Sequence, residues 1–259
     1  MCCRYFRELR PAPELPPGYV GLERRLAGLL TRPQQRRVDL TYLTKDHSSW
    51  VLHVPGWHPV GAEDFEAMWA LHPPSLGRNS FQGRSVATPR YFQAFGRSYS
   101  FSGQVAEALP LSRVPLAETA RQRIKALLLE LGPCSDEAAG VRPVAKLSDG
   151  ETDRDRDRDR GSLPPAPNGV LVNWYLASHY IGLHRDDTRE LVPFAPVWSI
   201  SWGHSRLFCL RPRCDDKPAR GGRCSAISAV GSARHVAEFD ASGNRGLEIE
   251  LGHGDLLIM

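Results

Sequence analysis

Hydrophobic residues recur at helical spacing in three stretches of the chain. The longest is 115–131, where Pro115 opens the first turn and Gly132-Pro133 follows the last one. Its apolar positions form one stripe, typical of a helix that packs on a sheet: Leu116, Ala120, Ile124, Leu127, Leu128 and Leu131. A helix is also predicted at 63–71, which carboxylates open. Another is predicted near the N-terminus, where four leucines share one face: Leu22, Leu26, Leu29 and Leu30.

After residue 169 the pattern changes to short runs that are apolar throughout or alternate between apolar and polar residues. These runs have the length of β-strands: 170–175, 196–203, 207–211, 247–251 and 255–259. A further strand is predicted at 49–55. Successive strands without intervening helices are typical of a sandwich or barrel rather than of a parallel sheet. The expected fold class is therefore α+β, with the helices of the first half packed on a β-rich second half.

Two segments do not follow these patterns, and they define the expected domain organisation. Residues 1–37 are rich in proline and arginine and are expected to be a basic N-terminal arm that contains one helix. Residues 134–167 include an Asp-Arg dipeptide repeated four times, flanked by Gly, Ser and Pro, and such a composition cannot bury a core. We expect one domain at 38–259, with a low-complexity insertion at 134–167.

The composition narrows the function classes without choosing one. With 259 residues, of which 41% are hydrophobic and 24% charged, the chain is long enough for one domain with a core. Its formal net charge of +4 permits a polyanionic partner but does not require one. No apolar run approaches the roughly 20 residues of a membrane span, and the first residues lack the apolar core of a signal peptide. We expect an intracellular protein, nuclear or cytoplasmic, that is monomeric and has no membrane partner.

The six cysteines include no C-x-x-C pair, and an intracellular compartment would keep them reduced. Lipidation of Cys2 and Cys3 is one alternative. A zinc site is another, since three cysteines and a histidine fall in one segment, although the C-x4-C spacing is only marginally suitable: Cys209, Cys214, Cys224 and His235.

The residues with chemical potential are concentrated between 173 and 211. His184 is followed two positions later by Asp186, which places both side chains on one face of a strand or strand end. A histidine and a carboxylate so spaced are two ligands of the 2-His-1-carboxylate triad that holds non-haem Fe(II), and the third would be a distal histidine. His-Arg-Asp also occurs in protein-kinase catalytic loops, but those need an asparagine where this chain has Leu191.

Several further motifs surround this pair in a fixed order. They are Pro89-Arg90, Tyr99-Ser100-Phe101-Ser102-Gly103, Asn173-x-Tyr175, His184-Arg185-Asp186-Asp187-x-x-Glu190-Leu191 and Ser199-x-Ser201-x-Gly203-x-x-Arg206-x-Phe208-x-x-Arg211. The ordered set closely resembles the AlkB family of Fe(II)/2-oxoglutarate dioxygenases, and most of all the branch that repairs alkylated bases in duplex DNA. The resemblance covers roughly residues 50–259 and excludes both the arm and the insertion.

The resemblance implies a double-stranded β-helix, or jelly roll, with flanking N-terminal helices. It implies that His184 and Asp186 are the catalytic residues that ligate Fe(II), and that Asn173 and Tyr175 hydrogen-bond the co-substrate 2-oxoglutarate. The implied activity is oxidative demethylation of alkylated DNA or RNA bases. The co-substrate is decarboxylated to succinate, and the hydroxylated methyl group leaves as formaldehyde.

For the nucleic-acid substrate, the resemblance implies that Tyr99 and Phe101 stack on a flipped base and that Asp187 is a polar residue near it. Simpler structural roles stay open. Tyr99 and Phe101 could be core aromatics, and Asn173 and Tyr175 could satisfy a strand edge. The small residues Ser199, Ser201 and Gly203 are expected to serve packing rather than chemistry.

Residues 251–259 resemble the family's strand that precedes the distal histidine. We therefore expect that histidine, and the two arginines that follow it in the family, to lie beyond Met259. His253 is an alternative third ligand, although it occupies a position before that strand. A second function hypothesis is accordingly a catalytically dead AlkB-like module that binds nucleic acid or protein.

Overall fold

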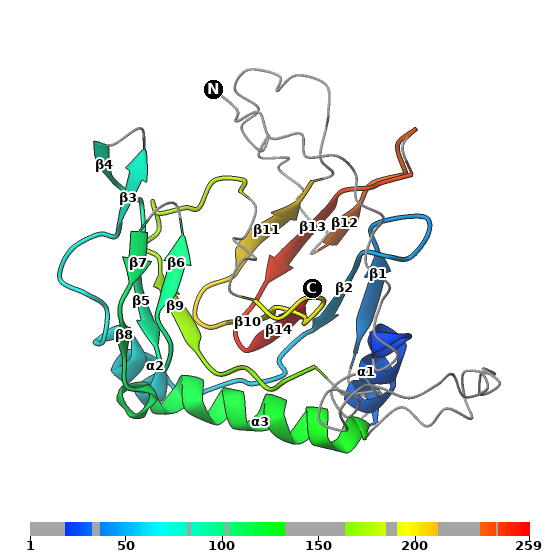
Figure 1. Ribbon diagram of the computed structural model, residues 1–259, viewed down its shortest axis with the longest axis horizontal. Coiled ribbons are helices and arrows are strands. Elements are labelled where there is room, and N and C mark those ends of the chain that lie inside the picture. The colour runs from blue at the N-terminus through cyan, green and yellow to red at the C-terminus, as the bar shows by residue number, and fades with distance from the viewer. Residues whose placement is uncertain are drawn as a thin grey trace, which may run out of the picture.

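The computed structural model describes residues 19–32, 37–81, 84–101, 104–132, 164–184, 191–211, 234–241 and 243–259 (Figure 1). The three predicted helices are confirmed as α1 (Leu22–Thr31), α2 (Ala62–Trp69) and α3 (Pro115–Leu131), with a short 3-10 helix, η3 (Leu111–Arg113), before α3. Pro115 occupies the first turn of α3, and Gly132 follows its end at a positive φ of 63°. None of the helices in the described part of the chain combines the length and apolar character that a membrane crossing requires.

A four-stranded antiparallel sheet holds the end of the chain. Its strands are β1 (Asp39–Tyr42), β2 (Trp50–Val54), β10 (Trp198–Ser201) and β14 (Asp255–Ile258), in the order β1-β2-β14-β10. All four residues of β14 are buried because the strand pairs on both sides. The prediction that the terminus is a sheet strand is confirmed.

The other strands form two three-stranded sheets and two hairpins. One sheet has the order β11-β13-β12, from β11 (Arg206–Leu210), β12 (Arg234–Val236) and β13 (Leu247–Leu251). The other has the order β8-β5-β9, from β5 (Tyr91–Phe95), β8 (Ala108–Leu109) and β9 (Val170–Trp174). The hairpins pair β3 (Arg78–Phe81) with β4 (Arg84–Ala87), and β6 (Tyr99–Phe101) with β7 (Gln104–Ala106). Every strand predicted from the sequence is present, and the α+β class is confirmed.

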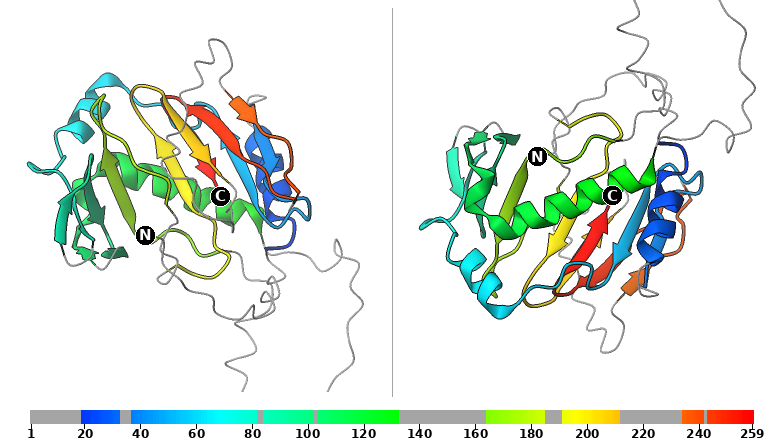
Figure 2. Two further views of the ribbon diagram at one scale, coloured as in Figure 1. Left: turned by 90° about the horizontal axis from the view of Figure 1, so that it is seen from above. Right: turned by 90° about the horizontal axis from the view of Figure 1, so that it is seen from below.

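The largest core cluster lies between the helices and the four-stranded sheet. Figure 2 shows α3 running across the strands on one face. The cluster combines residues of α1, α3, β2 and β14: Leu22, Leu26, Leu30, Ile124, Leu128, Leu52, Val54, Leu256 and Ile258. The helix predicted within the arm is therefore part of the packed body, while the arm's boundary at residue 37 stays a prediction.

The end of the predicted insertion also contacts this body. Ala166 packs against the core cluster, and Arg121 of α3 donates a hydrogen bond of 3.2 Å to the carbonyl of Pro167. The Asp-Arg repeat at 153–160 lies outside the described residues. The insertion at 134–167 and its low-complexity character therefore stay predictions.

A buried histidine joins α3 to the segment after β2. The Arg123 guanidinium donates to Nδ1 of His58 and lies 4.5 Å from the ring centroid of Trp57, while the indole N–H of Trp202 donates to the carbonyl of His58 over 3.0 Å. Because arginine keeps its proton, Nδ1 of His58 must be the acceptor, so the ring is neutral. Burial, and then the charge of Arg123, lower the pKa of His58.

This arrangement predicts a loss of stability in mild acid. The unfolded chain binds a proton at His58 near pH 6.5, whereas the folded chain does not, so stability rises with pH across that range. The contribution is complete above about pH 6.5 and is lost as the pH falls toward the lowered pKa of the folded state. Melting temperatures at pH 7.5 and 5.5 should therefore differ more for the wild type than for His58→Asn, whose amide oxygen can still accept from Arg123. Equal differences would contradict the assignment.

Candidate active site

The pairing of β5 with β9 determines which side chains share a face. Tyr91 lies opposite Trp174, and Phe92 lies opposite Asn173. Because side chains alternate along a strand and directly opposed residues point the same way, Asn173 and Phe92 share one face. Arg90 lies two positions before Phe92 and Tyr175 lies two positions after Asn173, so both side chains continue that face. Trp174 lies on the opposite face, where its indole N–H donates to the carbonyl of Met68 over 2.9 Å and fixes the ribbon against α2.

The shared face carries two buried polar atoms that have no hydrogen-bond partner within the described part of the chain. They are Nε of Arg90 and Oδ1 of Asn173. Arg90 is only 8% exposed, its guanidinium is hydrogen-bonded to the Tyr175 side chain, and it lies 5.7 Å from the ring centroid of Phe92. Buried polar atoms are nearly always paired. Two orphaned atoms on one face are therefore the kind of feature that a polar ligand would satisfy.

Tyr175 is held between two arginines. Burial raises the pKa of its hydroxyl, and the nearby Arg90 and Arg206 lower it by less. The hydroxyl therefore keeps its proton at neutral pH and can donate a hydrogen bond. The Arg206 guanidinium lies 5.5 Å from the Tyr175 ring centroid.

Arg206, from β11, fixes the loop that follows Tyr175. It donates to the carbonyl of His179 over 2.7 Å and also to the carbonyl of Leu176. These hydrogen bonds explain why the sequence motif has an arginine at position 206 without assigning Arg206 a role in the chemical reaction. The loop that Arg206 holds leads directly to His184.

His184 is exposed, and its Nδ1 lies 2.8 Å from the carbonyl oxygen of Gly182. Only a protonated Nδ1 can donate to that carbonyl, and this tautomer keeps the lone pair on Nε2, which a metal ion requires. Asp186 and Asp187 lie outside the described residues, so the His184–Asp186 pair stays a prediction. Within the described ranges, no group of three or more histidine, cysteine or acidic side chains could hold a metal ion.

The zinc alternative involves Cys209, Cys214, Cys224 and His235. Cys209 lies in β11 and forms no disulfide with another described residue. Cys214 and Cys224 lie outside the described residues, so the zinc alternative is not tested.

His253, the alternative third ligand, is held by hydrogen bonds to backbone groups. The N–H of Gly203 donates to its Nδ1 over 3.0 Å, and its Nε2 lies 3.0 Å from the carbonyl of Val60, to which it can donate. Both ring nitrogens are thus used by backbone groups, which opposes metal ligation by this residue. Gly203 has a φ of 96°, and a Cβ there would lie 2.9 Å from the Phe65 ring, so its place in the motif reflects packing.

The predicted base-stacking residues lie in the β6–β7 hairpin, which Figure 1 places beside β5 and β9. Tyr99 is half-buried in β6. The side chain of Phe101 lies outside the described residues. The predicted shared cavity of Tyr99, Phe101 and His184 therefore stays a prediction.

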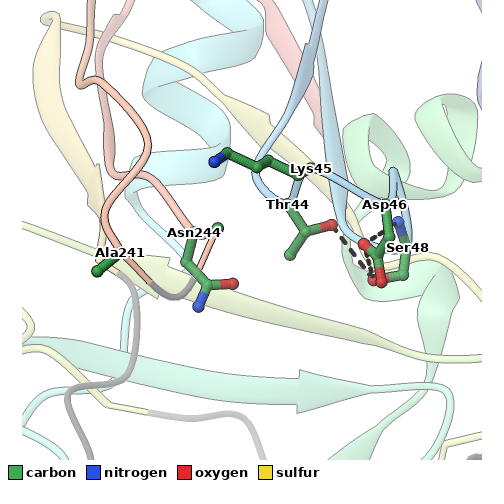
Figure 3. A pocket seen from close by; sticks show the side chains of 7 residues that line it. Thr44, Lys45, Asp46, Ser48, Ala241 and Asn244 are labelled. Atoms are coloured by element: carbon green, nitrogen blue, oxygen red, sulfur yellow. Dashed lines mark hydrogen bonds between the residues drawn. The ribbon is translucent and has the colours of Figure 1, made fainter.

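A separate hollow of about 510 Å³ lies between the turn after β1 and the turn before β13 (Figure 3). It contains none of the predicted site residues: Thr44, Lys45, Asp46, Ser48, Ala241, Gly243 and Asn244 line it. Hydrogen bonds from the Thr44 side chain and from Ser48 lower the pKa of Asp46 to about 2. The Asp46 carboxylate accepts bonds of 3.0 and 2.8 Å from Ser48, so it is already used within its own turn.

The described residues form a mixed α+β architecture with several antiparallel sheets. The sequence model of the 2OG-Fe(II) oxygenase superfamily matches residues 81–259, and the chain belongs to that superfamily. Two relatives are the DNA oxidative demethylases ALKBH2 of Mus musculus and of Homo sapiens, 38% and 37% identical over 93 residues. The match covers 36% of this chain and 30% and 28% of those proteins, less than a third of their length.

The polar face fits a carboxylate ligand such as 2-oxoglutarate. A carboxylate accepts hydrogen bonds only, and the face presents the N–H groups of Arg90 and the hydroxyl of Tyr175. The Asn173 amide can turn its NH2 group to the same side, since a rotation of the amide by about 180° exchanges the positions of its oxygen and nitrogen. The superfamily's co-substrate is therefore chemically compatible with residues that this chain buries.

Proposed function

We propose that the protein is an Fe(II)- and 2-oxoglutarate-dependent demethylase of alkylated nucleic-acid bases. The observation that carries the proposal is the polar face of Asn173, Tyr175 and Arg90, where two buried atoms lack a hydrogen-bond partner among the described residues, in a chain whose residues 81–259 match the superfamily. The similarity to DNA oxidative demethylases supports a nucleic-acid substrate, alkylated DNA or RNA. We further propose that it acts as an intracellular monomer, nuclear or cytoplasmic.

The proposed architecture is a double-stranded β-helix. In this proposal the sheets β1-β2-β14-β10 and β11-β13-β12 are its two faces. The domain spans 38–259, with an arm at 1–37 and an insertion at 134–167.

The proposed roles follow the positions of the residues. His184 and Asp186 would hold the iron, and Asn173 and Tyr175 would hold the 2-oxoglutarate. When bound, the metal and its co-substrate supply the oxidation of the N-methyl carbon. The chain orients them: Arg206 holds the loop between Tyr175 and His184, and the hydrogen bond from His184 Nδ1 to Gly182 sets the tautomer that presents Nε2.

The test is direct demethylation. The protein is incubated with Fe(II), 2-oxoglutarate, ascorbate and oligonucleotides carrying N-methylated bases, in single-stranded DNA, duplex DNA and RNA. Loss of the methyl group, measured by mass spectrometry together with equimolar succinate, supports the proposal. Binding of the oligonucleotides without succinate or demethylation would instead favour a catalytically dead nucleic-acid-binding module.

Phe101→Ala should separate substrate binding from co-substrate turnover. An aromatic ring stacked on a base contributes about 1–3 kcal/mol, so demethylation should fall by roughly 5- to 150-fold. Consumption of 2-oxoglutarate without a nucleic acid should stay near the wild-type rate, because the ring does not touch the co-substrate in this proposal. Tyr99→Ala should behave in the same way, and Asp187→Asn should also lower demethylation. Equal loss of both rates would identify Phe101 as a core residue.

A further inference from the structure

Arg90 is a buried cation without an anionic partner among the residues that the structure describes. Its side chain is 8% exposed, and Nε has no hydrogen-bond partner in that part of the chain. No ion pair of the described residues includes it. Arginine cannot lose its proton to escape this environment. A buried charge is costly unless it is paired, so this position needs an explanation beyond folding.

The other buried charges that the structure describes are paired, which makes Arg90 distinctive among them. Asp255 accepts from His53 and from two backbone N–H groups. Glu248 pairs with Arg211. By contrast, the contacts of Arg90 are a hydrogen bond with the neutral Tyr175 and an aromatic face, that of Phe92, at 5.7 Å. Neither contact neutralises a positive charge.

We propose that Arg90 binds a carboxylate of 2-oxoglutarate, with the Tyr175 hydroxyl as a second donor to the same carboxylate. The inference rests on the proposed function of this site and names a further binding residue within it. A guanidinium offers parallel N–H donors that match the two oxygens of a carboxylate. Tyr175 and Asn173 lie on the same face of the β5–β9 ribbon, so all three polar groups can meet one small anion.

The experiment compares Arg90→Met with Arg90→Lys and with a matched control, Arg97→Met. Arg97 follows β5, is exposed, and carries the same charge. Binding of 2-oxoglutarate is measured by calorimetry on the Mn(II)-loaded protein, which avoids dependence on turnover. We expect Arg90→Met to weaken binding by at least about tenfold, because charge-assisted bidentate bonds are lost. The affinity of Arg90→Lys for 2-oxoglutarate should lie between those of Arg90→Met and the wild type. The affinity of Arg97→Met should stay within about twofold of the wild type.

The melting temperature of Arg90→Met is a second measurement. It should fall if Arg90 only stabilises the fold, but not if Arg90 serves to bind the ligand. Removing an unpaired buried charge should leave the melting temperature of Arg90→Met equal to or above that of the wild type. Adding 2-oxoglutarate should raise the melting temperature of the wild type and of Arg97→Met, but hardly that of Arg90→Met. A strongly lowered melting temperature of Arg90→Met, with an unchanged response to the ligand, would overturn the proposal.

An oligonucleotide arm distinguishes carboxylate from phosphate. Affinity for a methylated oligonucleotide, measured by fluorescence anisotropy, should be the same for Arg90→Met and Arg97→Met. If Arg90→Met loses oligonucleotide affinity and keeps its affinity for 2-oxoglutarate, Arg90 binds phosphate and the proposal is wrong. Wild-type affinity for 2-oxoglutarate in Arg90→Met would also overturn it. If the wild type itself binds no 2-oxoglutarate, both this inference and the proposed function fail, whereas equal binding by the wild type and Arg90→Met makes this inference alone fail.

Discussion

Replacing Asp186 with alanine is expected to abolish iron-dependent succinate formation. In the proposed site, Asp186 supplies the carboxylate of the metal triad and His184 an imidazole. Loss of a group that only orients a ligand costs about 10- to 100-fold in metal affinity. Loss of the ligand itself should cost at least as much, so Mn(II) affinity should fall by more than about a hundredfold. The measurements are Mn(II) titration by electron paramagnetic resonance and succinate release under saturating Fe(II).

The control is Glu190→Gln, which removes the same charge from the same motif four positions later. It should bind Mn(II) like the wild type, because the prediction assigns no ligand to Glu190. His184→Ala should fail in the same way as Asp186→Ala. Retained metal affinity in Asp186→Ala would show that Asp186 is not a ligand. Equal losses in Glu190→Gln and Asp186→Ala would show that the charge of the loop, rather than one ligand, is responsible.

Local patterns were sufficient to predict the elements that carry their own signals. Helix α3 has a proline at its start, a glycine after its end and one apolar stripe, and all three are visible within 18 residues of sequence. Strands β13 and β14 are apolar runs of ordinary length. The strands β6, β7, β8 and β12 are only two or three residues long, and such short segments carry too few residues for a period to show.

The site depended more on partners that are distant in sequence. Asn173 and Tyr175 could be placed on one face by strand alternation alone, but the burial of Arg90 depends on β9, about 80 residues further along the chain. Its only local signal is an arginine directly before the apolar run of β5. His58 and Arg123 are 65 residues apart, and nothing local to either residue predicts their hydrogen bond. The tautomer of His184 likewise required the position of the Gly182 carbonyl.

The largest loss of stability is expected from Asp255→Ala. Asp255 begins β14, which carries Leu256, Leu257 and Ile258 into the core with no exposed surface. Its carboxylate accepts three hydrogen bonds: 2.8 Å from the N–H of Gly56, 2.8 Å from the N–H of Gly252 and 2.9 Å from Nε2 of His53. Both side chains of the His53–Asp255 pair are less than 10% exposed. Alanine would leave all three donors buried and unpaired, which should cost about 3–5 kcal/mol.

Urea denaturation at pH 7 measures this loss, with Asp240→Ala as the matched control. Asp240 also accepts a hydrogen bond from a backbone N–H, 2.9 Å from Asn244, but it is exposed, so its loss should cost only about 0.5–1.5 kcal/mol. The loss of stability for Asp255→Asn should lie between those for Asp255→Ala and Asp240→Ala, because the amide keeps one acceptor oxygen but turns its NH2 group toward other donors. A cost for Asp255→Ala no larger than for Asp240→Ala would mean that the three bonds contribute little to the fold.

The same carboxylate determines how stability responds to strong acid. Burial alone would raise the pKa of Asp255, but the N–H groups of Gly252 and Gly56, together with His53, lower it overall. The folded chain therefore holds this group ionised at a pH where the unfolded chain, with a pKa of about 3.9, is protonated. The stabilisation that the Asp255 carboxylate provides is complete above the unfolded pKa. It is lost as the pH falls from there toward the lower pKa of the folded state. Between about pH 5 and 2.5, the wild type should lose more stability than Asp255→Asn, which has no proton to gain. Parallel curves for the two proteins would show that the turn from Gly252 to Asp255 is held by its backbone instead, where Gly254 has a φ of 81° and leaves no room for a Cβ against Pro59.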